Sequence, residues 1–407
     1  MPRRSRAPIW LMGLGNATFG MYSGVIVIAV PQLLSARHVP ESTIASMTAV
    51  MVSPGFWGFV FSPILDVRFS RRWYSVATAL AASLLFVLAL VRIDHLIWVE
   101  VLLTIGYFFA CLYQSALGGW LASITTAEEE NRLSAWVTVG NIGGGGLMAM
   151  TTGELVRNLS PGAAALLLGA AILLPISIFP FMQAPGPDRR LARESFGKFF
   201  GEVLSLLKRR EVLIAIALFL APAATFSLTN FLAGLGADFH ASGRFVGLVA
   251  GAGVMLGGTF GCLLFPRMDR LLPLRPLYLA IGAAGAVFTL ALLTLPLSPA
   301  AFAIAMIGEN AFQGLAITAS TAIAFETIGR DNPLSATTFC VMVSAYNAPI
   351  TYMLFVDGAG YEWRGVAGSL LADAAVSFLA CIVLAALLRR LSHSRARGAA
   401  LQATVDD

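Results

Sequence analysis

The chain has 407 residues, of which 57% are hydrophobic and only 12% charged, with a formal net charge of +5. A soluble globular domain usually has about 25% charged residues, so this composition excludes one and indicates an integral membrane protein. The four cysteines lie in different apolar segments without CxxC spacing, so we expect neither a disulfide framework nor a metal site.

Apolar segments long enough to cross a bilayer follow one another along the whole chain, since a transmembrane helix needs about 20 mostly apolar residues. The expected spans cover residues 9–34, 43–65, 73–91, 96–123, 133–156, 163–182, 212–236, 245–265, 276–295, 300–327, 334–356 and 363–388. The first is too long for a signal-peptide core and has no small-residue cleavage pattern, so we expect it to be retained. The prediction is an all-α membrane protein with twelve transmembrane helices.

Positive charge is concentrated on one side of these spans. The even-numbered gaps, the central linker and the two tails hold 22 of the 27 Lys and Arg residues. By the positive-inside rule, both termini lie in the cytoplasm, and we expect a multi-pass protein of the inner membrane. The net charge therefore reflects topology, and no nucleic-acid partner is expected.

The chain divides into two halves of similar layout. An N-terminal six-helix bundle (1–182) precedes a cytoplasmic linker (183–210), a C-terminal six-helix bundle (211–390) and a cytoplasmic tail (391–407). In the linker, one helical face is apolar, which predicts an amphipathic helix at the membrane surface; that face comprises Phe196, Phe199, Phe200, Val203, Leu206 and Leu207. "NRLSA" at 131–135 recurs as "NPLSA" at 332–336, and "ATF" at 17–19 recurs at 224–226. Two six-span repeats related by an axis along the membrane normal describe the major facilitator architecture.

The loop after the second span, "FSPILDVRFSRRWY", carries an aspartate followed by arginines, and "FPRMDRLLPLR" repeats this after the eighth span. It resembles the signature of the major facilitator superfamily. In that superfamily the aspartate caps a facing helix end and pairs with cytoplasmic arginines, which implies a cytoplasmic gate at Asp66, Arg71, Arg72, Asp269 and Arg270. The arginine that many sugar and drug carriers have in the fourth span is missing here, so the resemblance does not extend to a standard drug antiport mechanism.

A narrower resemblance rests on four segments, "FGMYSG" (19–24), "FVFSPILD" (59–66), "GENAFQG" (308–314) and "LSATTF" (334–339). They are similar to the muropeptide permease AmpG and its relatives, which include acetyl-coenzyme A and siderophore carriers. The resemblance implies proton-driven import of a bulky organic solute. No Lys or Arg lies at mid-membrane depth, where a phosphate-rich substrate would need bidentate arginine clamps. A muropeptide or siderophore type is therefore favoured over an acyl-coenzyme A or drug-like compound.

Glu309 lies near the middle of an otherwise apolar span, about 15 Å from its outer end at helical rise. A carboxylate there is penalised by roughly 2.5 to 3.5 kcal/mol, so it normally faces a cavity or a partner. We predict that Glu309 is the proton-coupling residue; the alternative is a protonated carboxyl that holds a neighbouring helix in place. Asp373 is the rival, but the twelfth span usually packs outside the cavity in the superfamily, which implies a structural or oligomer role for Asp373.

A polar stripe on the tenth span is expected to face a matching stripe on the fourth span across a central cavity. Individually, such side chains more often form interhelical hydrogen bonds. The predicted lining is Asn16, Tyr22, Ser23, Tyr107, Gln114, Thr225, Thr229, Asn230, Asn310, Gln313, Tyr346 and Asn347. Small-molecule substrate, protons and the lipid bilayer are the expected partners of a monomer without cofactors.

Glycines four residues apart in the fifth and eighth spans predict close helix approach, and the family fold implies that these two spans meet at the interface between the halves. Pro222 and Pro349 predict kinks.

Other function classes lack their residues in this chain. There is no GxxxxGK[ST] loop for ATP-driven transport, and no histidine falls within a span to activate Ser23, so we do not expect an enzyme. A membrane sensor or lipid-handling protein on the same fold is the alternative to a transporter.

Overall fold

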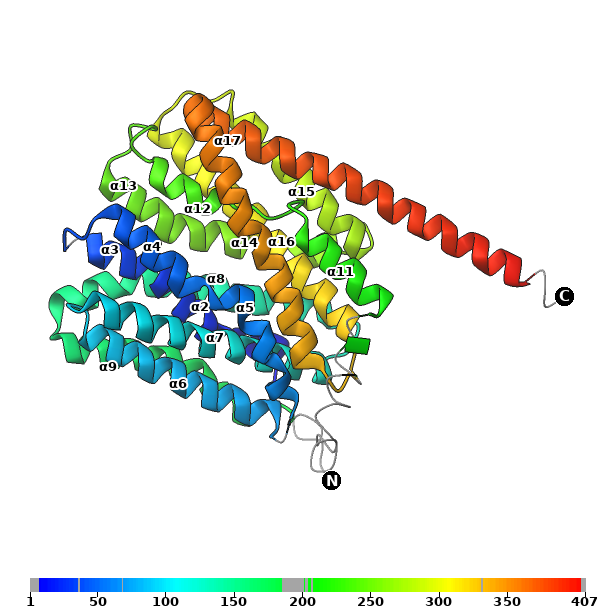
Figure 1. Ribbon diagram of the computed structural model, residues 1–407, viewed down its shortest axis with the longest axis horizontal. Helices are drawn as coiled ribbons and strands as arrows, with labels where there is room; N and C mark the ends of the chain where they lie inside the picture. The colour runs from blue at the N-terminus through cyan, green and yellow to red at the C-terminus, as the bar shows by residue number, and fades with distance from the viewer. Residues whose placement is uncertain are drawn as a thin grey trace.

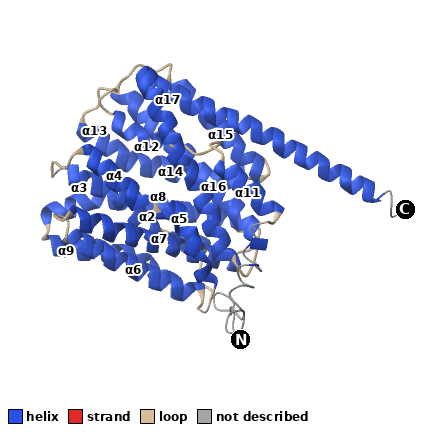
Figure 2. Cartoon of the chain, in the orientation of Figure 1, coloured by secondary structure: helices blue, strands red, loops and turns tan. Residues whose placement is uncertain are grey.

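A computed structural model describes residues 7–35, 37–67, 69–184, 201, 204–205, 208–330 and 332–403. Within these ranges the regular elements are all helices, without a strand (Figures 1 and 2). The amphipathic face predicted for the linker lies outside the described residues. Two bundles lie side by side in Figure 1, one coloured blue to cyan-green and the other green to orange.

The first bundle contains six spans. The first two are segmented, because tighter or wider turns interrupt the α-helix: α1 (Ile9–Leu14), α2 (Ala17–Gly24), η1 (Val25–Ala29) and α3 (Val30–Ser35) form the first, and α4 (Glu41–Val52), α5 (Pro54–Trp57) and η2 (Gly58–Asp66) form the second. The other four are α6 (Arg71–Val91), α7 (Leu96–Ile124), α8 (Glu130–Asn158), and α9 (Pro161–Leu173) with η3 (Leu174–Phe181).

The second bundle repeats this layout. Its seventh and eighth spans are segmented, as α11 (Arg210–Leu220), α12 (Leu228–Leu232) and η4 (Ala233–Leu235), then α13 (Gly243–Leu248), η5 (Val249–Gly253) and α14 (Val254–Met268). The rest are α15 (Leu274–Leu292), α16 (Pro299–Ile328) and α17 (Ser335–Ala403). Non-helical backbone at Arg364 and Gly365 divides α17 into two arms, the eleventh and twelfth spans. In Figure 1 the second arm continues beyond the bundle toward the C-terminus.

Twelve spans are therefore present, as predicted. Of the described helices, nine are long and apolar enough to cross a membrane, and one of these is α17, which contains two spans. The remaining two are α8, whose glycines and polar residues lower its hydropathy, and the interrupted seventh span. Large apolar side chains such as Leu84 on α6 and Leu166 on α9 are exposed, as expected of surfaces that face lipid.

Loops alternate between two ends of the bundles. We call the linker end the one that holds residues 67, 69–70, 125–129, 269–273, 329–330 and 332–334, and the far end the one that holds residues 92–95, 159–160, 293–298 and 364–365.

The predicted glycine contacts are present, but the tightest of them lie within each half. A Cβ on Gly20 of α2 would lie 2.0 Å from Asn141 O of α8, and one on Gly261 of α14 would lie 2.0 Å from Ala311 O of α16. The expected meeting of α8 with α14 also occurs, with Gly146 against Met255. Backbone approach of this kind needs residues without a side chain, so the glycines chiefly bind helices together inside each bundle.

The seventh span is broken and not merely kinked. Residues 221–227 leave the helix after Leu220, since Pro222 has no N–H to continue it, and Phe226 adopts φ +51°, which is uncommon for a residue other than glycine. Side chains from α17 satisfy freed carbonyls: Tyr352 Oη donates to Leu220 O (2.7 Å) and Cys381 Sγ to Ala223 O (3.1 Å). Irregular backbone at membrane depth is stable when protein groups satisfy it in this way. Pro349, by contrast, lies within helical backbone of α17.

Candidate functional site

Asp66 joins the two halves at the linker end. Its carboxylate accepts hydrogen bonds from the backbone N–H groups of Ala336 (3.2 Å) and Thr337 (2.8 Å) and from Thr337 Oγ1 (2.7 Å). Arg71 Nε donates to the same carboxylate (2.9 Å), while Arg71 Nη2 donates to Pro333 O (2.8 Å). An anion at the first turn of α17 satisfies orphan N–H groups and interacts favourably with the helix dipole. Asp66 therefore caps a helix of the opposite half.

Three further hydrogen bonds cross between the halves at this end. Arg330 Nε donates to Thr125 O (2.6 Å), Asn131 Nδ2 donates to Asp269 Oδ2 (2.6 Å), and Ser335 Oγ donates to Gly119 O (2.9 Å). Together with the Asp66 contacts they form what we call the linker-end latch. The described conformation is closed at this end.

The remaining predicted gate residues contribute differently. Asp269 bonds to Asn131 of the other half, and neither Arg72 nor Arg270 forms a hydrogen bond or ion pair with another described residue. Glu130, at the start of α8 and before the apolar part of that helix, lies close to Glu326 and Arg330. Burial, reinforced by the Glu326 carboxylate and opposed by Arg330, raises the pKa of Glu130 to about 7.

In the first bundle, the structure brings several predicted cavity residues together. The Tyr107 ring lies 6.3 Å from the Tyr22 ring, and Ser23 lies close to Tyr107. Across the halves, a Cβ on Gly55 would lie 3.7 Å from Tyr107 and 3.9 Å from Asn347 Nδ2, so these two residues flank α5.

Asn16 and Gln114 do not join this group by any described contact. Asn16 Nδ2 instead donates to Val137 O of α8 (3.1 Å), which ties the first span to the fifth, and Gln114 is half-buried on α7.

In the second bundle the predicted residues are divided. Gln313 Nε2 donates to Thr229 Oγ1 (3.0 Å), which joins α16 to the broken seventh span, whereas Asn310 Nδ2 donates to Met306 O of its own helix (2.8 Å). Thr225 and Tyr346 are buried, and their hydroxyls have no hydrogen-bond partner among the described residues. Asn230 is exposed.

Glu309 is fully buried on the side of α16 that faces α15. Its Oε1 lies 2.5 Å from Thr289 Oγ1, and its Oε2 has no partner in the described part of the chain. Phe288 of α15 packs against the neighbouring Gly308, where a Cβ would lie 2.1 Å from the ring. The carboxyl therefore points into the second bundle, away from the position opposite Tyr107 that the internal repeat predicted.

Two more buried carboxyl groups lie close to Glu309. Ser227 Oγ is 2.9 Å from Asp357 Oδ2 and 3.3 Å from Asp373 Oδ1, and both aspartates are within electrostatic range of Glu309. Asp357 belongs to the first arm of α17 and Asp373 to the second, while Ser227 ends the break in the seventh span. We call Glu309, Asp357 and Asp373 the carboxyl cluster. Among the described residues, none of the three forms an ion pair.

A sequence model of the Major Facilitator Superfamily matches residues 12–333, which is most of the chain. The chain belongs to the major facilitator superfamily. Members of this superfamily are transporters, so the protein is a secondary transporter of the membrane and not an enzyme.

Solved structures of the superfamily share the fold. FucP, an MFS transporter in the outward conformation, has a TM-score of 0.65 and 14% identity, over 93% of this chain and 98% of that one. The human organic anion transporter MFSD10 has a TM-score of 0.67 and 14% identity, over 94% and 100%. A bacterial homologue of the iron transporter ferroportin, in an outward-facing state with soaked iron, has a TM-score of 0.59 and 18% identity, over 92% and 97%. At these identities the likeness concerns the fold alone, and no curated protein matched the sequence.

In the carboxyl cluster of this major facilitator protein, the neighbouring hydroxyl groups have too few hydrogen atoms to give every ionised carboxylate a hydrogen bond. Thr289 Oγ1 also lies 3.0 Å from Gly285 O, and if its one hydrogen is donated there, only a protonated Glu309 can complete the 2.5 Å contact. Ser227 likewise has one hydrogen for two carboxyl groups. Since an isolated buried carboxylate is strongly disfavoured, neutral forms are expected in this cluster.

Sequence reasoning missed Asp357 and assigned Asp373 a structural or oligomer role. The eleventh span was predicted to end at Val356, one residue before Asp357, because hydropathy falls at that point. The helix continues to Trp363, so Asp357 is fully buried. Asp373 is also buried, and Ser227 Oγ lies 3.3 Å from its Oδ1. Helical periodicity continued past Val356 could have indicated Asp357, whereas Asp373 already lay within the predicted span 363–388.

Proposed function

We propose that this protein is a proton-coupled symporter that imports a bulky organic solute of the muropeptide or siderophore type across the inner membrane by alternating access, with Glu309 as the coupling residue. The observation that carries the proposal is the burial of Glu309. Its carboxyl bonds to a neutral hydroxyl, and no described cation pairs with it. A carboxyl in such a place can bind and release a proton, whereas a permanent ion pair would hold it ionised.

Helix α16 offers a mechanical connection between Glu309 and the broken seventh span. Gln313 lies one turn from Glu309 and donates to Thr229 Oγ1, and the ring of Phe312 stacks on that of Phe226 with centroids 5.9 Å apart. Loss of the proton would place an uncompensated charge against α15. The helix would then shift relative to α15, and the seventh span would shift with it.

The linker-end latch supplies the gate of this cycle. We assign the linker end to the cytoplasm, because positive charge is concentrated there, and both termini with it. Import requires that the contacts of Asp66, Arg71 and Asp269 open once per cycle, while Arg72 and Arg270 supply the surrounding positive charge. In the closed state described here, the solute would enter from the far end.

Solute binding is proposed at the aromatic and polar surface formed by Tyr22, Ser23 and Tyr107, with Asn347 opposite. Among the described Lys and Arg residues Arg71 alone is buried, and Asp66 already binds it. A cation for phosphate groups is therefore lacking, which supports a weakly charged solute over a coenzyme A thioester. The muropeptide or siderophore class itself rests on the AmpG resemblance.

The test is uptake by proteoliposomes that contain wild type, Glu309→Gln or the control Glu154→Gln, an exposed carboxyl at the far end. A labelled muropeptide and a labelled ferric siderophore are offered under an inward proton gradient and under equilibrium exchange. Glu309→Gln is expected to lose accumulation but keep exchange, since the amide can hydrogen-bond but cannot titrate. Unchanged accumulation in this variant refutes the coupling role. If wild type moves no solute under any gradient, a membrane sensor or lipid-handling protein is favoured.

A further inference from the structure

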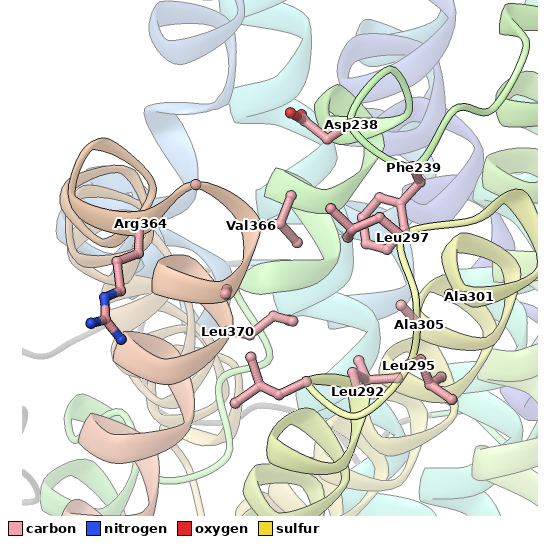
Figure 3. Close-up of a pocket in the computed structure, with 13 residues that line it drawn as sticks. Asp238, Phe239, Leu292, Leu295, Leu297, Ala301, Ala305, Arg364, Val366 and Leu370 are labelled. Carbon is pink, nitrogen blue, oxygen red and sulfur yellow. The ribbon is translucent and has the colours of Figure 1, made fainter.

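A cavity of about 290 Å³ opens at the far end of the second bundle (Figure 3). Asp238, Phe239 and Leu297 lie toward its mouth, and apolar side chains of α15, α16 and α17 line its depth. Arg364 borders the cavity, but in Figure 3 its guanidinium points away from it, and its Cζ lies 4.8 Å from the centre of the Trp363 ring. The mouth is therefore polar on one side, and the interior is mostly apolar.

The floor of this cavity lies directly above the carboxyl cluster. Leu370 precedes Asp373 by three residues, Ala305 precedes Glu309 by four, and Leu292 follows Thr289 by three. Each of these steps is one helical turn, about 5 Å, from the far end inward, because α16 and the second arm of α17 begin at the far end and α15 ends there. Three helices thus place the cavity one turn away from the cluster.

Asp357, Ser227 and Asp373 are arranged to share a hydrogen. All three are buried, Asp357 Oδ1 has no described partner, and the Ser227 hydroxyl lies between the two carboxyl groups at 2.9 and 3.3 Å. The titratable group that faces the pair is Glu309 from α16; Asp238 and Arg364 border the cavity at its mouth, where Tyr361 Oη donates to Asp238 Oδ1. The segments of α15 and of the seventh span at this depth contribute hydroxyls only, from Thr289 and Ser227.

We propose that Asp357, Ser227 and Asp373 form a proton-binding site distinct from Glu309, and that protons reach it from the far end through this cavity. Asp373 takes up one proton and donates it in a hydrogen bond to Ser227 Oγ. Ser227 donates its own hydrogen to Asp357 Oδ2, so one proton leaves a single negative charge on the pair. The site stands on its own geometry. In a transport cycle a proton would bind here before it reaches Glu309, and this role rests on the proposed coupling function.

A proton fits this arrangement better than a metal cation does. A calcium ion takes six to eight oxygen ligands. The oxygens here are separated by hydrogen-bond distances with a hydroxyl between them, and among the described residues no three His, Cys, Asp or Glu side chains converge as metal ligands.

Infrared spectroscopy of the purified full chain in lipid tests the site. The carbonyl band of protonated carboxyl groups is recorded from acid to alkaline pH in wild type, Asp357→Asn, Asp373→Asn and Glu309→Gln, with Glu154→Gln as the exposed control. We expect wild type to show a protonated band that is lost in both aspartate variants and remains in Glu309→Gln. Ser227→Ala keeps both carboxyl groups and is expected to shift this band, which covers the case in which an aspartate variant fails to fold.

Identical protonated-carboxyl bands in wild type and in both aspartate variants would show that the pair holds no proton and would refute the proposal. It also falls if sodium chloride, compared with choline chloride at the same pH, removes the band and raises the melting temperature. If Glu309→Gln transports normally while the aspartate band behaves as expected, the coupling role of Glu309 fails and the site remains.

Cysteine labelling tests the route. Leu297→Cys at the mouth and Ala305→Cys at the floor are treated with a membrane-impermeant thiol reagent in whole cells and in inverted vesicles; the native cysteines are all buried. We expect both positions to react from the far end, Ala305→Cys more slowly. Reaction of Ala305→Cys only after denaturation, or only from the linker end, refutes the route.

Discussion

Replacement of Asp66 is expected to open the linker-end latch. In Asp66→Ala, the backbone N–H groups of Ala336 and Thr337 lose their acceptor, and the buried guanidinium of Arg71 loses its carboxylate. In Asp66→Asn, an amide oxygen can still accept from α17, but the charge that balances Arg71 is gone.

The size of the effect follows from these contacts. Removing one partner of a buried ion pair costs about 3 to 5 kcal/mol, and losing the acceptor at a helix N-terminus costs about 0.5 to 2 kcal/mol. These two costs overlap, so we expect the latched state to lose about 3 to 5 kcal/mol of stability relative to the open state in Asp66→Ala, and less in Asp66→Asn. Each 1.4 kcal/mol is a factor of about ten, so the ratio of latched to open molecules should fall at least a hundredfold.

Electron spin resonance between labels on the two halves measures this ratio. Labels at the exposed positions Glu128 and Leu271 report the separation of the halves at the linker end. We expect one short distance in wild type, a mainly long distance in Asp66→Ala and a mixture in Asp66→Asn. Asp94→Asn, at an exposed aspartate of the far end, should match wild type. An unchanged short distance in Asp66→Ala would refute the reasoning.

Three further predictions concern the linker end, the glycine contacts and the topology. The folded-state pKa of Glu130, about 7, lies above its ordinary 4.5, so its contribution to stability is full below about 4.5 and is lost as the pH rises through about 7. The melting temperature should therefore fall over this range in wild type and fall less in Glu130→Gln; equal slopes would contradict the assignment. Gly20→Ala should lower stability by about 1 to 3 kcal/mol, because its Cβ would meet Asn141 O, whereas nothing lies within 4 Å of a Cβ on Gly143, so Gly143→Ala should be nearly neutral; equal melting temperatures would contradict this. A fluorescent protein that folds only in the cytoplasm should fluoresce when fused to the C-terminus, and a dark fusion would reverse the proposed orientation.

The spans and the motif at Asp66 could be predicted because they depend on local sequence. Hydropathy identifies a helix whose backbone must be satisfied within lipid. The resemblance to the superfamily signature implies the capping role of Asp66. The break in the seventh span was visible only as Pro222, because its extent depends on Tyr352 and Cys381, which satisfy the freed carbonyls from another helix.

The direction of Glu309 could not be predicted in the same way. Helical spacing shows which residues share a face, but it does not show which neighbour that face meets. Contact with Thr289 instead of the fourth span is decided by the packing of α16 on α15, where Phe288 fits against Gly308. The carboxyl cluster likewise depends on the fold, because its aspartates lie 16 residues apart on two arms that Gly365 turns against each other.

The claim that Glu309 carries a transported proton is tested most directly inside the vesicle. A pH-sensitive dye is trapped in proteoliposomes of wild type and Glu309→Gln, and solute is added without a pre-formed gradient. The proposed mechanism predicts that solute entry acidifies the lumen in wild type and that solute enters Glu309→Gln vesicles without acidifying them. Acidification in Glu309→Gln, or solute entry into wild-type vesicles without any change of pH, would contradict it.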